Sequence, residues 1–261
     1  MINISIDPVA FSIGPIEVRW YGIFIALAIV ALVSWTIREV RHGAKVSYDT
    51  VFTAALVGIP SGIIISRLLH VIDQWDYYIQ NPAQIIGASG LTAYGAVLGA
   101  ALGIWIYSKA SNFKFAYFAD VLAPGIILAQ AIGRIGCTLN GCCFGSPTSL
   151  PWSIVYTHPG SLCPLDTPVQ PTTIYEIFFN LIVFGILVKL RGRFKPDGSL
   201  FLIYLSSYSL WRLSSDFLRE GASFLFGLHQ AQVIAIIVLA IAIPMLAYRT
   251  RWVKKEESAG E

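Results

Sequence analysis

Long apolar runs separated by short polar segments dominate the chain. Seven of these runs are predicted to be helices, and each approaches the ~20 residues that a helix needs to cross a bilayer. They cover residues 20–37, 50–72, 86–107, 116–135, 171–190, 199–218 and 230–248. Because lipid offers no partner for backbone N–H and C=O groups, this pattern favours an all-α, polytopic integral membrane protein.

The composition supports the same class. Hydrophobic residues make up 56% of the 261 positions and charged residues only 13%, about half the charged fraction of a soluble domain. The formal net charge of +3 is not gathered on a soluble face, which excludes nucleic acid as a partner. We therefore expect one transmembrane domain over residues 1–261.

Two further features concern the arrangement of the spans. Gly95, Gly99 and Gly103 recur every four residues in the third span, a spacing that predicts close packing against another helix. The connection 136–170 is long and contains five prolines. Such a loop usually carries function when it is ordered.

The basic residues orient the spans. Thirteen of the 18 lysines and arginines fall on one side of an alternating topology, which the positive-inside rule makes the cytoplasm. These are Arg38, Arg41, Lys45, Lys109, Lys114, Lys189, Arg191, Arg193, Lys195, Arg249, Arg251, Lys254 and Lys255. The N-terminus and the 136–170 loop are therefore expected outside, and the 249–261 tail in the cytoplasm.

The remaining five basic residues fall at the outer end or in the outer half of a span. They are Arg19, Arg67, Arg134, Arg212 and Arg219. Because an arginine at helix depth costs at least ~2.5 kcal/mol on insertion scales, each needs a compensating partner. One explanation is snorkelling or pairing with acids at similar depth, which are Glu17, Glu176, Asp216 and Glu220. Since guanidinium groups bind phosphate through parallel hydrogen bonds, five arginines together favour an anionic ligand site.

Polar residues of the sixth span follow helical spacing. Tyr208, Arg212, Asp216 and Arg219 stand at i, i+4, i+8 and i+11, within an arc of roughly 80° on a helix. We expect one stripe facing the bundle, in which Asp216 can orient either arginine. A salt bridge that locks the helices is the alternative, but two arginines to one acid leave positive charge over.

All four cysteines fall on the predicted outer side, at positions 137, 142, 143 and 163. An oxidising compartment favours disulfides, for example between Cys163 and Cys142 or Cys143, although sequence leaves the pairing open. A zinc site is the alternative, but the adjacent Cys142 and Cys143 lack the usual spacer of about two to four residues. We therefore expect no metal and no other cofactor.

The segment around Arg134 resembles a known signature. It reads Gly133-Arg134-Ile135-Gly136, followed by Asn140-Gly141 and Gly145. This pattern resembles the signature of the bacterial prolipoprotein diacylglyceryl transferases, which use phosphatidylglycerol. Other segments are similar to the same family in the same order, over roughly residues 7–220. They are Asp7-Pro8 to Arg19-Trp20-Tyr21-Gly22, Tyr94-Gly95 to Gly99, Pro171 to Tyr175-Glu176, and Tyr208 to Arg219-Glu220.

The resemblance implies transfer of the diacylglyceryl group from phosphatidylglycerol to the thiol of a lipobox cysteine in a prolipoprotein, with release of glycerol phosphate. It also implies that Arg134 and Arg212 bind the lipid headgroup and are essential. The family positions and the sixth-span stripe together give the remaining expected substrate-binding residues. These are Tyr21, Asn140, Gly145, Glu176, Tyr208 and Arg219.

The chain departs from the family where a base is expected. Many members have other residues at four positions: His at Tyr94, Asn at Cys137, Glu at Cys142 and His at Gln170. A cysteine thiol is only a few per cent ionised at pH 7, so the reaction needs an activated acceptor. The candidate bases are Tyr94, Asp216, Glu176 and His158, unless the positive field alone activates the thiol. The predicted catalytic set is Arg134, Arg212, Tyr94 and Asp216.

Two other classes of function remain open at the level of sequence. A transporter would place ionisable residues along a path through the membrane, often in repeated halves, and here Asp120 is the main exception to their outer placement. A non-catalytic phospholipid-binding protein would bind phosphatidylglycerol without turnover. In the favoured hypothesis the chain is a multi-pass protein of the bacterial cytoplasmic membrane, and its partners are phosphatidylglycerol, the prolipoprotein signal peptide and the lipid bilayer.

Overall fold

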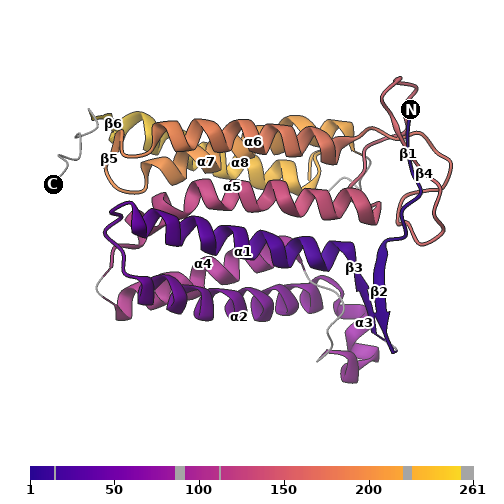
Figure 1. The fold of residues 1–261 in the computed structure, drawn as a ribbon, viewed down its shortest axis with the longest axis horizontal. Coiled ribbons are helices and arrows are strands. Elements are labelled where there is room, and N and C mark those ends of the chain that lie inside the picture. The colour runs from indigo at the N-terminus through magenta and orange to yellow at the C-terminus, as the bar shows by residue number, and fades with distance from the viewer. Residues whose placement is uncertain (15, 86–91, 112, 220–224, 254–261) are drawn as a thin grey trace. The chain divides into compact units, whose positions relative to one another are not determined.

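The chain is mostly helical (Figure 1). The computed structural model describes residues 1–14, 16–85, 92–111, 113–219 and 225–253, with the backbone alone at residues 16, 93 and 94. The chain forms two compact units, of which the first joins Met1–Trp35 to Ala119–Glu261 and the second is Thr36–Phe118.

Eight α-helices carry most of the described residues. They are α1 (Trp20–Arg41), α2 (Tyr48–Asp73), α3 (Trp75–Gln80), α4 (Ala93–Ala110), α5 (Phe115–Asn140), α6 (Thr172–Leu190), α7 (Ser199–Ser215) and α8 (Gln230–Arg249). Two short 3₁₀ helices accompany them, η1 (Pro82–Gln84) and η2 (Asp216–Leu218). The strands are short and pair two by two: β1 (Ile2–Ile4) with β4 (Ile154–Tyr156), β2 (Val9–Ile13) with β3 (Ile16–Arg19), and β5 (Phe194–Lys195) with β6 (Arg251–Trp252).

Each predicted span overlaps a described helix, and the mostly helical membrane architecture is confirmed. In the described part of the chain, five helices are long and apolar enough to cross a membrane, namely α1, α2, α5, α6 and α8. The helices over the third and sixth predicted spans, α4 and α7, are shorter. Seven crossings therefore remain a prediction, and residues 86–91 of the third predicted span lie outside the described residues.

Two helices end at other residues than the predicted spans do. The helix over the fourth predicted span, 116–135, continues to Asn140, and Thr138 donates its hydroxyl to the Arg134 carbonyl within the last turn. It ends at Gly141, whose φ of +66° is the left-handed conformation that often follows a helix. The helix over the sixth predicted span, 199–218, is α7, which ends at Ser215. The 3₁₀ turn η2 follows it and precedes Arg219.

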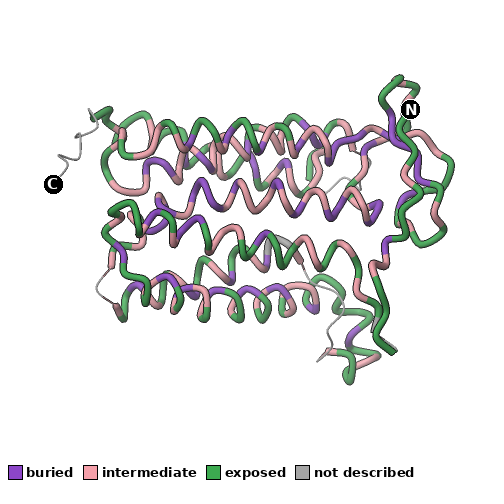
Figure 2. The backbone as a smooth tube through the Cα atoms, viewed as in Figure 1, coloured by how far each residue is buried: buried purple, intermediate pink, exposed green. Residues whose placement is uncertain are grey.

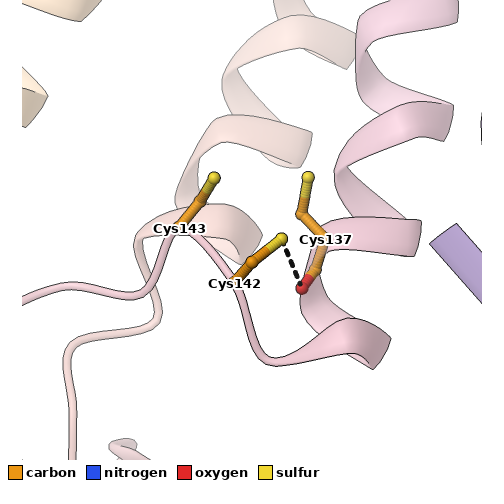
Figure 3. Close-up of side chains that lie close together, drawn as sticks. All are labelled: Cys137, Cys142 and Cys143. Carbon is orange, nitrogen blue, oxygen red and sulfur yellow. Dashed lines mark hydrogen bonds between the residues drawn. The ribbon is translucent and has the colours of Figure 1, made fainter. Parts of the chain in front are cut away.

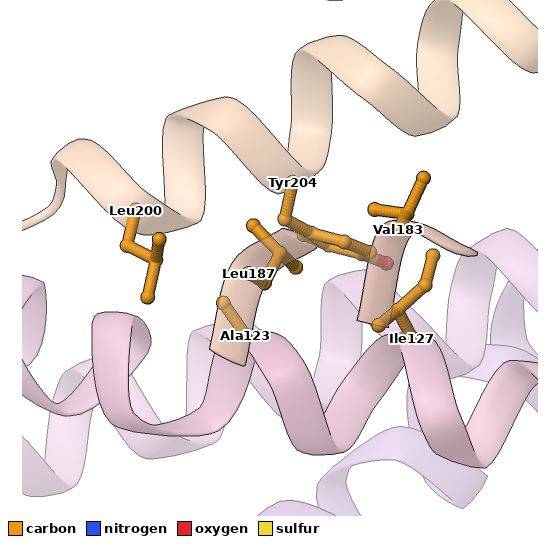
Figure 4. Packing of buried hydrophobic residues seen from close by; sticks show 6 residues of the cluster. All are labelled: Ala123, Ile127, Val183, Leu187, Leu200 and Tyr204. Atoms are coloured by element: carbon orange, nitrogen blue, oxygen red, sulfur yellow. The ribbon is translucent and has the colours of Figure 1, made fainter. Parts of the chain in front are cut away.

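In the first unit, α5, α6 and α7 pack around an apolar cluster (Figures 1 and 4). Its buried members are Ala123, Ile127, Val183, Leu187, Leu200 and Tyr204. Trp35 of α1 donates its indole N–H to the Val121 carbonyl at 3.1 Å and packs edge-on against Phe184. Because lipid is as apolar as these side chains, dispersion contacts and such hydrogen bonds hold the helices together.

Many positions along the helices are exposed (Figure 2), and large apolar residues occupy a number of them. On α2 these include Leu56, Ile63, Ile64 and Leu68, and on α8 they include Ile237, Ile241 and Ile243. Rows of exposed leucine and isoleucine would drive a soluble protein to aggregate, but they match the solvent that surrounds a helix in a bilayer. The exposed faces of these helices are therefore suited to contact with lipid.

The connection after α5 is ordered by a small apolar cluster of its own. Ile154, Tyr156, Cys163 and Val169 are buried together, and β1 near the N-terminus pairs in parallel with β4. Tyr156 also donates its hydroxyl to the Thr138 carbonyl at 2.9 Å. This packing fixes the loop to the end of α5, where the residues of the predicted signature lie.

In the second unit, α2 and α4 pack closely through glycines. A Cβ atom added at Gly99 would lie 2.5 Å from the Ser61 carbonyl oxygen and 2.6 Å from the Ile65 Cβ atom. One added at Gly95 would lie 2.7 Å from the Ser66 Cα atom. The predicted packing role of the four-residue glycine spacing is therefore confirmed.

Candidate functional site

A fully buried carboxylate on α6 joins two arginines from distant parts of the chain. Glu176 is 0% exposed, and its Oε1 atom lies 2.9 Å from the Nε atom of Arg134 on α5. Its Oε2 atom lies 3.3 Å from the Nη2 atom of Arg219, and Tyr208 donates its hydroxyl to Oε1 at 3.2 Å. Because a buried carboxylate needs paired charges, Glu176 gathers Arg134, Arg219 and Tyr208 into one site.

A second buried carboxylate organises the end of α7. Asp216 binds the Nη2 atom of Arg212 through Oδ1 at 3.1 Å, and its Oδ2 atom lies 2.8 Å from the Nδ1 atom of His229. The sequence predicts that Asp216 can orient either arginine, and in the structure it pairs with Arg212. Arg219 follows η2 and pairs with Glu176 instead.

His229 is a site residue that the sequence analysis missed. It stands directly before the apolar run of α8, and its backbone N–H donates to the Gln232 side chain at 2.9 Å. A polar residue immediately before a long apolar run is a typical helix N-cap signal. That signal gives the position of His229 on α8 but not its partner on another element.

Positive charge exceeds negative charge in this site. The three guanidinium groups of Arg134, Arg212 and Arg219 face the two carboxylates of Glu176 and Asp216. Burial, followed by the positive charges of Arg212 and Arg134, lowers the pKa of Arg219, although a guanidinium stays charged in proteins. Among the described residues, the arginines of this site therefore outnumber its carboxylates by one.

Two guanidinium donors in this site have no hydrogen-bond acceptor within the described part of the chain. Among the described residues, the buried Nη1 atom of Arg212 and the buried Nε atom of Arg219 lack a hydrogen-bond partner. A buried donor without a partner costs more than a surface donor, especially when it is charged. The unsatisfied donors and the surplus charge therefore suit an anion with several acceptor oxygens, such as a phosphate ester.

Three cysteine side chains lie close together at the end of α5 and the turn that follows it (Figure 3). The Sγ atoms of Cys137, Cys142 and Cys143 are all within 4.8 Å of one another, and the Arg134 Nη1 atom lies 3.8 Å from the Cys137 sulfur. Hydrogen bonds with the Cys137 and Cys142 thiols and the positive charges of Arg134 and Arg219 lower the pKa of Cys143. Exposure differs within the cluster: Cys137 is buried, Cys142 is half-buried and Cys143 is exposed.

The predicted pairing of Cys163 with Cys142 or Cys143 is wrong in this structure. All four cysteines are free, and Cys163 is buried against Ile154, Tyr156 and Val169 in the apolar cluster of the loop. Spacing in the sequence could not separate Cys163 from the other three, because the turn after α5 decides which sulfurs meet.

Two signature residues, Asn140 and Gly145, shape the loop that carries the cysteines. Asn140 ends α5 and is buried, and its Oδ1 atom has no hydrogen-bond partner in the described chain. A Cβ atom added at Gly145 would lie 2.5 Å from the Gln170 Cβ atom and 2.6 Å from the Leu218 carbonyl oxygen. Gly145 is therefore required for close packing against the segment that leads to Arg219.

Tyr21 lies at the start of α1, where α1 approaches α5 closely. A Cβ atom added at Gly136 would lie 3.2 Å from the Tyr21 Cα atom. The Tyr21 side chain is exposed, and in the part of the chain that the structure describes no hydrogen bond joins its hydroxyl to the arginines. Its predicted role in substrate binding stays a prediction.

Four further candidates predicted from the sequence form no described contact with the arginine site. Arg19 forms an ion pair with Glu17 at 3.7 Å, as expected if it pairs with an acid at similar depth. The Nε2 atom of His158 lies 3.8 Å from the Oδ2 atom of Asp7. Arg67 belongs to the second unit, where it donates to the carbonyls of residues 84 and 85. The side chain of Tyr94 lies outside the described residues, so its role as a base stays a prediction.

Comparison with known proteins gives one consistent answer. The family model described as prolipoprotein diacylglyceryl transferase matches residues 8–248. A phosphatidylglycerol–prolipoprotein diacylglyceryl transferase of Dehalococcoides mccartyi (strain ATCC BAA-2266) is 50% identical over 257 residues, which are 98% of this chain and 99% of that protein. Proteins with the same name are 35% identical in Nostoc sp., over 94% of this chain and 89% of that protein, and 34% identical in Clostridioides difficile, over 88% and 90%.

Proposed function

Because the chain belongs to the prolipoprotein diacylglyceryl transferase family, we propose that it transfers the diacylglyceryl group of phosphatidylglycerol to the cysteine thiol of a prolipoprotein. The second product is glycerol phosphate. The observation that carries this proposal is the buried arginine site, in which Arg134, Arg212 and Arg219 face two carboxylates among the described residues. A phosphodiester supplies the missing negative charge and the missing acceptors.

The arginines assist cleavage of the bond between the glyceryl carbon and the phosphate oxygen. The acceptor sulfur forms a bond to the glyceryl carbon while the bond from that carbon to the phosphate oxygen breaks, and the electron pair stays on the phosphate. Negative charge therefore grows on the leaving glycerol phosphate. Fixed donors aimed at such charge lower the barrier, and the unpaired Nη1 atom of Arg212 and Nε atom of Arg219 are donors of this kind. Arg134 completes the binding set.

The acids in the site have positioning roles in this proposal. Glu176 holds Arg134 and Arg219, and Asp216 holds Arg212. A carboxylate in a close ion pair with a guanidinium is a weak base, because the pair favours the ionised form. We therefore place Asp216 and Glu176 among the residues that orient the arginines and do not assign the acceptor's proton to either.

The protein is a bacterial membrane protein. Its proposed place is the cytoplasmic membrane, with the N-terminus outside and the 249–261 tail inside, in agreement with the positive-inside rule. This orientation puts the arginine site and the cysteine loop near the outer leaflet, where a secreted prolipoprotein presents its lipobox cysteine.

The test is mass spectrometry of a synthetic lipobox peptide incubated with the purified protein and phosphatidylglycerol. We expect a diacylglyceryl mass increment on the peptide and its loss in Arg134→Ala and Arg212→Ala. Arg19→Ala is the matched control, since Arg19 pairs with Glu17 at an exposed position. Binding of phosphatidylglycerol without turnover would indicate a non-catalytic lipid-binding protein, and full activity of both site variants would overturn the mechanism.

A further inference from the structure

The cysteine cluster has the composition of a metal site. Cys137, Cys142 and Cys143 each offer one sulfur, and the three sulfurs lie within 4.8 Å of one another. Tetrahedral Zn²⁺ with Zn–S bonds of about 2.3 Å places its sulfurs about 3.8 Å apart. Small side-chain rotations would therefore bring the three sulfurs to coordination distance.

The backbone after α5 brings two adjacent cysteines to the same point. Gly141 has φ +66° and Cys143 has φ +60°, a left-handed conformation that is uncommon for residues other than glycine. The Cys142 N–H donates to the Cys137 carbonyl at 3.1 Å, and Thr172 donates its hydroxyl to the Cys143 carbonyl at 2.9 Å. These bonds hold both cysteines near Cys137 and remove the objection that adjacent cysteines lack a spacer.

We propose that Cys137, Cys142 and Cys143 bind a thiophilic divalent cation, Zn²⁺ in the cell, whose fourth position receives the acceptor cysteine. The inference rests on the proposed function. Three protein ligands with one open position are typical of catalytic zinc sites, whereas structural sites have four. Cys163 does not complete a fourth ligand, because it is buried in the apolar cluster of the loop. The exposed side of Cys143 leaves the fourth position accessible.

A positively charged side chain lies next to the position of this occupant. A divalent cation with three thiolates carries a net charge of −1, and the Arg134 Nη1 atom lies 3.8 Å from the Cys137 sulfur. A cationic donor next to a ligating sulfur stabilises the thiolate form that metals require. The same contact places the cation beside the arginine that binds the phosphate of the donor lipid.

The site supplies an activated acceptor thiol, a step for which the arginine site has no assigned base among the described residues. Coordination removes the thiol proton to solvent and keeps the sulfur as thiolate. That sulfur then bonds to the glyceryl carbon, and glycerol phosphate leaves with the electron pair of the broken C–O bond. The thioether product is neutral and a poorer ligand than thiolate, so it leaves the cation. No oxidant or reductant is needed.

Cobalt is the probe for the experiment, because Co²⁺ replaces Zn²⁺ and absorbs visible light. The full-length protein is reduced, stripped of metal and titrated with Co²⁺ in detergent. We expect one Co²⁺ per chain, with thiolate-to-cobalt charge-transfer bands and the intense visible bands of tetrahedral geometry. Adding a lipobox peptide should shift the visible bands, whereas a peptide with serine in place of its cysteine should not.

Substitutions assign the ligands. We expect at least about a 100-fold weaker Co²⁺ affinity in each of Cys137→Ser, Cys142→Ser and Cys143→Ser. This loss is larger than the loss of affinity typical of a substitution that only contacts a ligand. Cys163→Ser is the matched control and should bind as the wild type does. Cys143 is exposed, so its substitution tests the site even if the buried Cys137 variant does not fold. Unchanged binding in Cys142→Ser and Cys143→Ser, or a disulfide that persists in reductant, would overturn the site.

Activity separates this inference from the proposed function. Full transfer by metal-free protein would overturn the role of the cation and leave the transferase intact. Stoichiometric Co²⁺ binding through the three cysteines, without transfer under any condition, would retain the metal site and overturn the proposed function. Restoration of transfer by Zn²⁺ or Co²⁺ in stripped protein, but not by Mg²⁺, would support both.

Discussion

The Nδ1 atom of His229 lies 2.8 Å from the Oδ2 atom of Asp216, whose other oxygen binds Arg212 at 3.1 Å. His229 directly precedes α8, and Asp216 directly follows α7. The junction of these two helices therefore fixes the acid that orients an arginine proposed to bind the lipid headgroup.

Replacing His229 with alanine should weaken lipid binding more than it slows the chemical step. The change removes a hydrogen bond to a charged group, worth about 1.5–3 kcal/mol, and leaves Arg212 less firmly placed. We expect the KM for phosphatidylglycerol to rise at least about tenfold with kcat changed much less. Steady-state kinetics with a lipobox peptide measure both, and His229→Asn should restore part of the effect. A fall in kcat at constant KM would contradict a positioning role.

Replacing Glu176 with glutamine should destabilise the protein and abolish transfer. The change leaves the buried guanidinium groups of Arg134 and Arg219 without their shared carboxylate. Breaking a buried pair from one side costs roughly 3–5 kcal/mol, which thermal unfolding in detergent would report as a lower Tm. Glu17→Gln is the control, since the exposed pair with Arg19 contributes about 0–1 kcal/mol. Equal Tm values for the two variants would show that Glu176 is not the organising charge.

The sequence predicted the helices and part of the site because both are local signals. Apolar runs of about twenty residues are recognisable without any knowledge of packing. Placing an arginine at helix depth in a membrane costs free energy, so Arg134, Arg212 and Arg219 each indicate that a compensating partner lies nearby. The close packing of Gly99 on α2 followed from spacing in the same way.

The rest of the site depends on contacts between residues that are distant in the chain. No spacing rule relates His229 to Asp216, because the partner is set by how α8 returns to the end of α7. Arg219 pairs with Glu176 and not with Asp216, because the single 3₁₀ turn at η2 takes it off the polar stripe of α7. The grouping of Cys143 with Cys137 likewise depends on two left-handed residues after α5.

Cys163 should resist alkylation in the folded protein. Its burial raises the pKa of its thiol to about 11, so at pH 8 the reactive thiolate is rare. Raising the pH toward 11 increases the thiolate fraction and should increase the rate. Peptide mapping after iodoacetamide treatment at pH 8 is expected to find the exposed Cys143 modified and Cys163 modified only after denaturation. Rapid labelling of native Cys163 would contradict the buried position.

Replacing Gly99 with valine should separate α2 from α4. The added Cβ would lie 2.5 Å from the Ser61 carbonyl oxygen, a backbone atom that cannot move without shifting the helix. Overpacking of this kind costs about 1–3 kcal/mol or more, visible as a lower Tm in detergent. The control is Gly185→Val, because a Cβ at Gly185 meets nothing within 4 Å. Similar Tm values for the two variants would contradict close glycine-mediated packing.

Two glycines of the signature segment should differ in their response to alanine. At Gly145 the new Cβ would lie 2.5 Å from the Gln170 Cβ atom and 2.6 Å from the Leu218 carbonyl oxygen, so the loop after Cys143 must move. We expect at least about a tenfold loss of lipid transfer and a lower Tm. At Gly133 the nearest atom is 3.7 Å away, and alanine there should stabilise α5 by about 0.5–1 kcal/mol. Loss of transfer in Gly133→Ala at unchanged Tm would instead mean that the lipid approaches the α5 backbone at this glycine, because the protein itself leaves room for the methyl group.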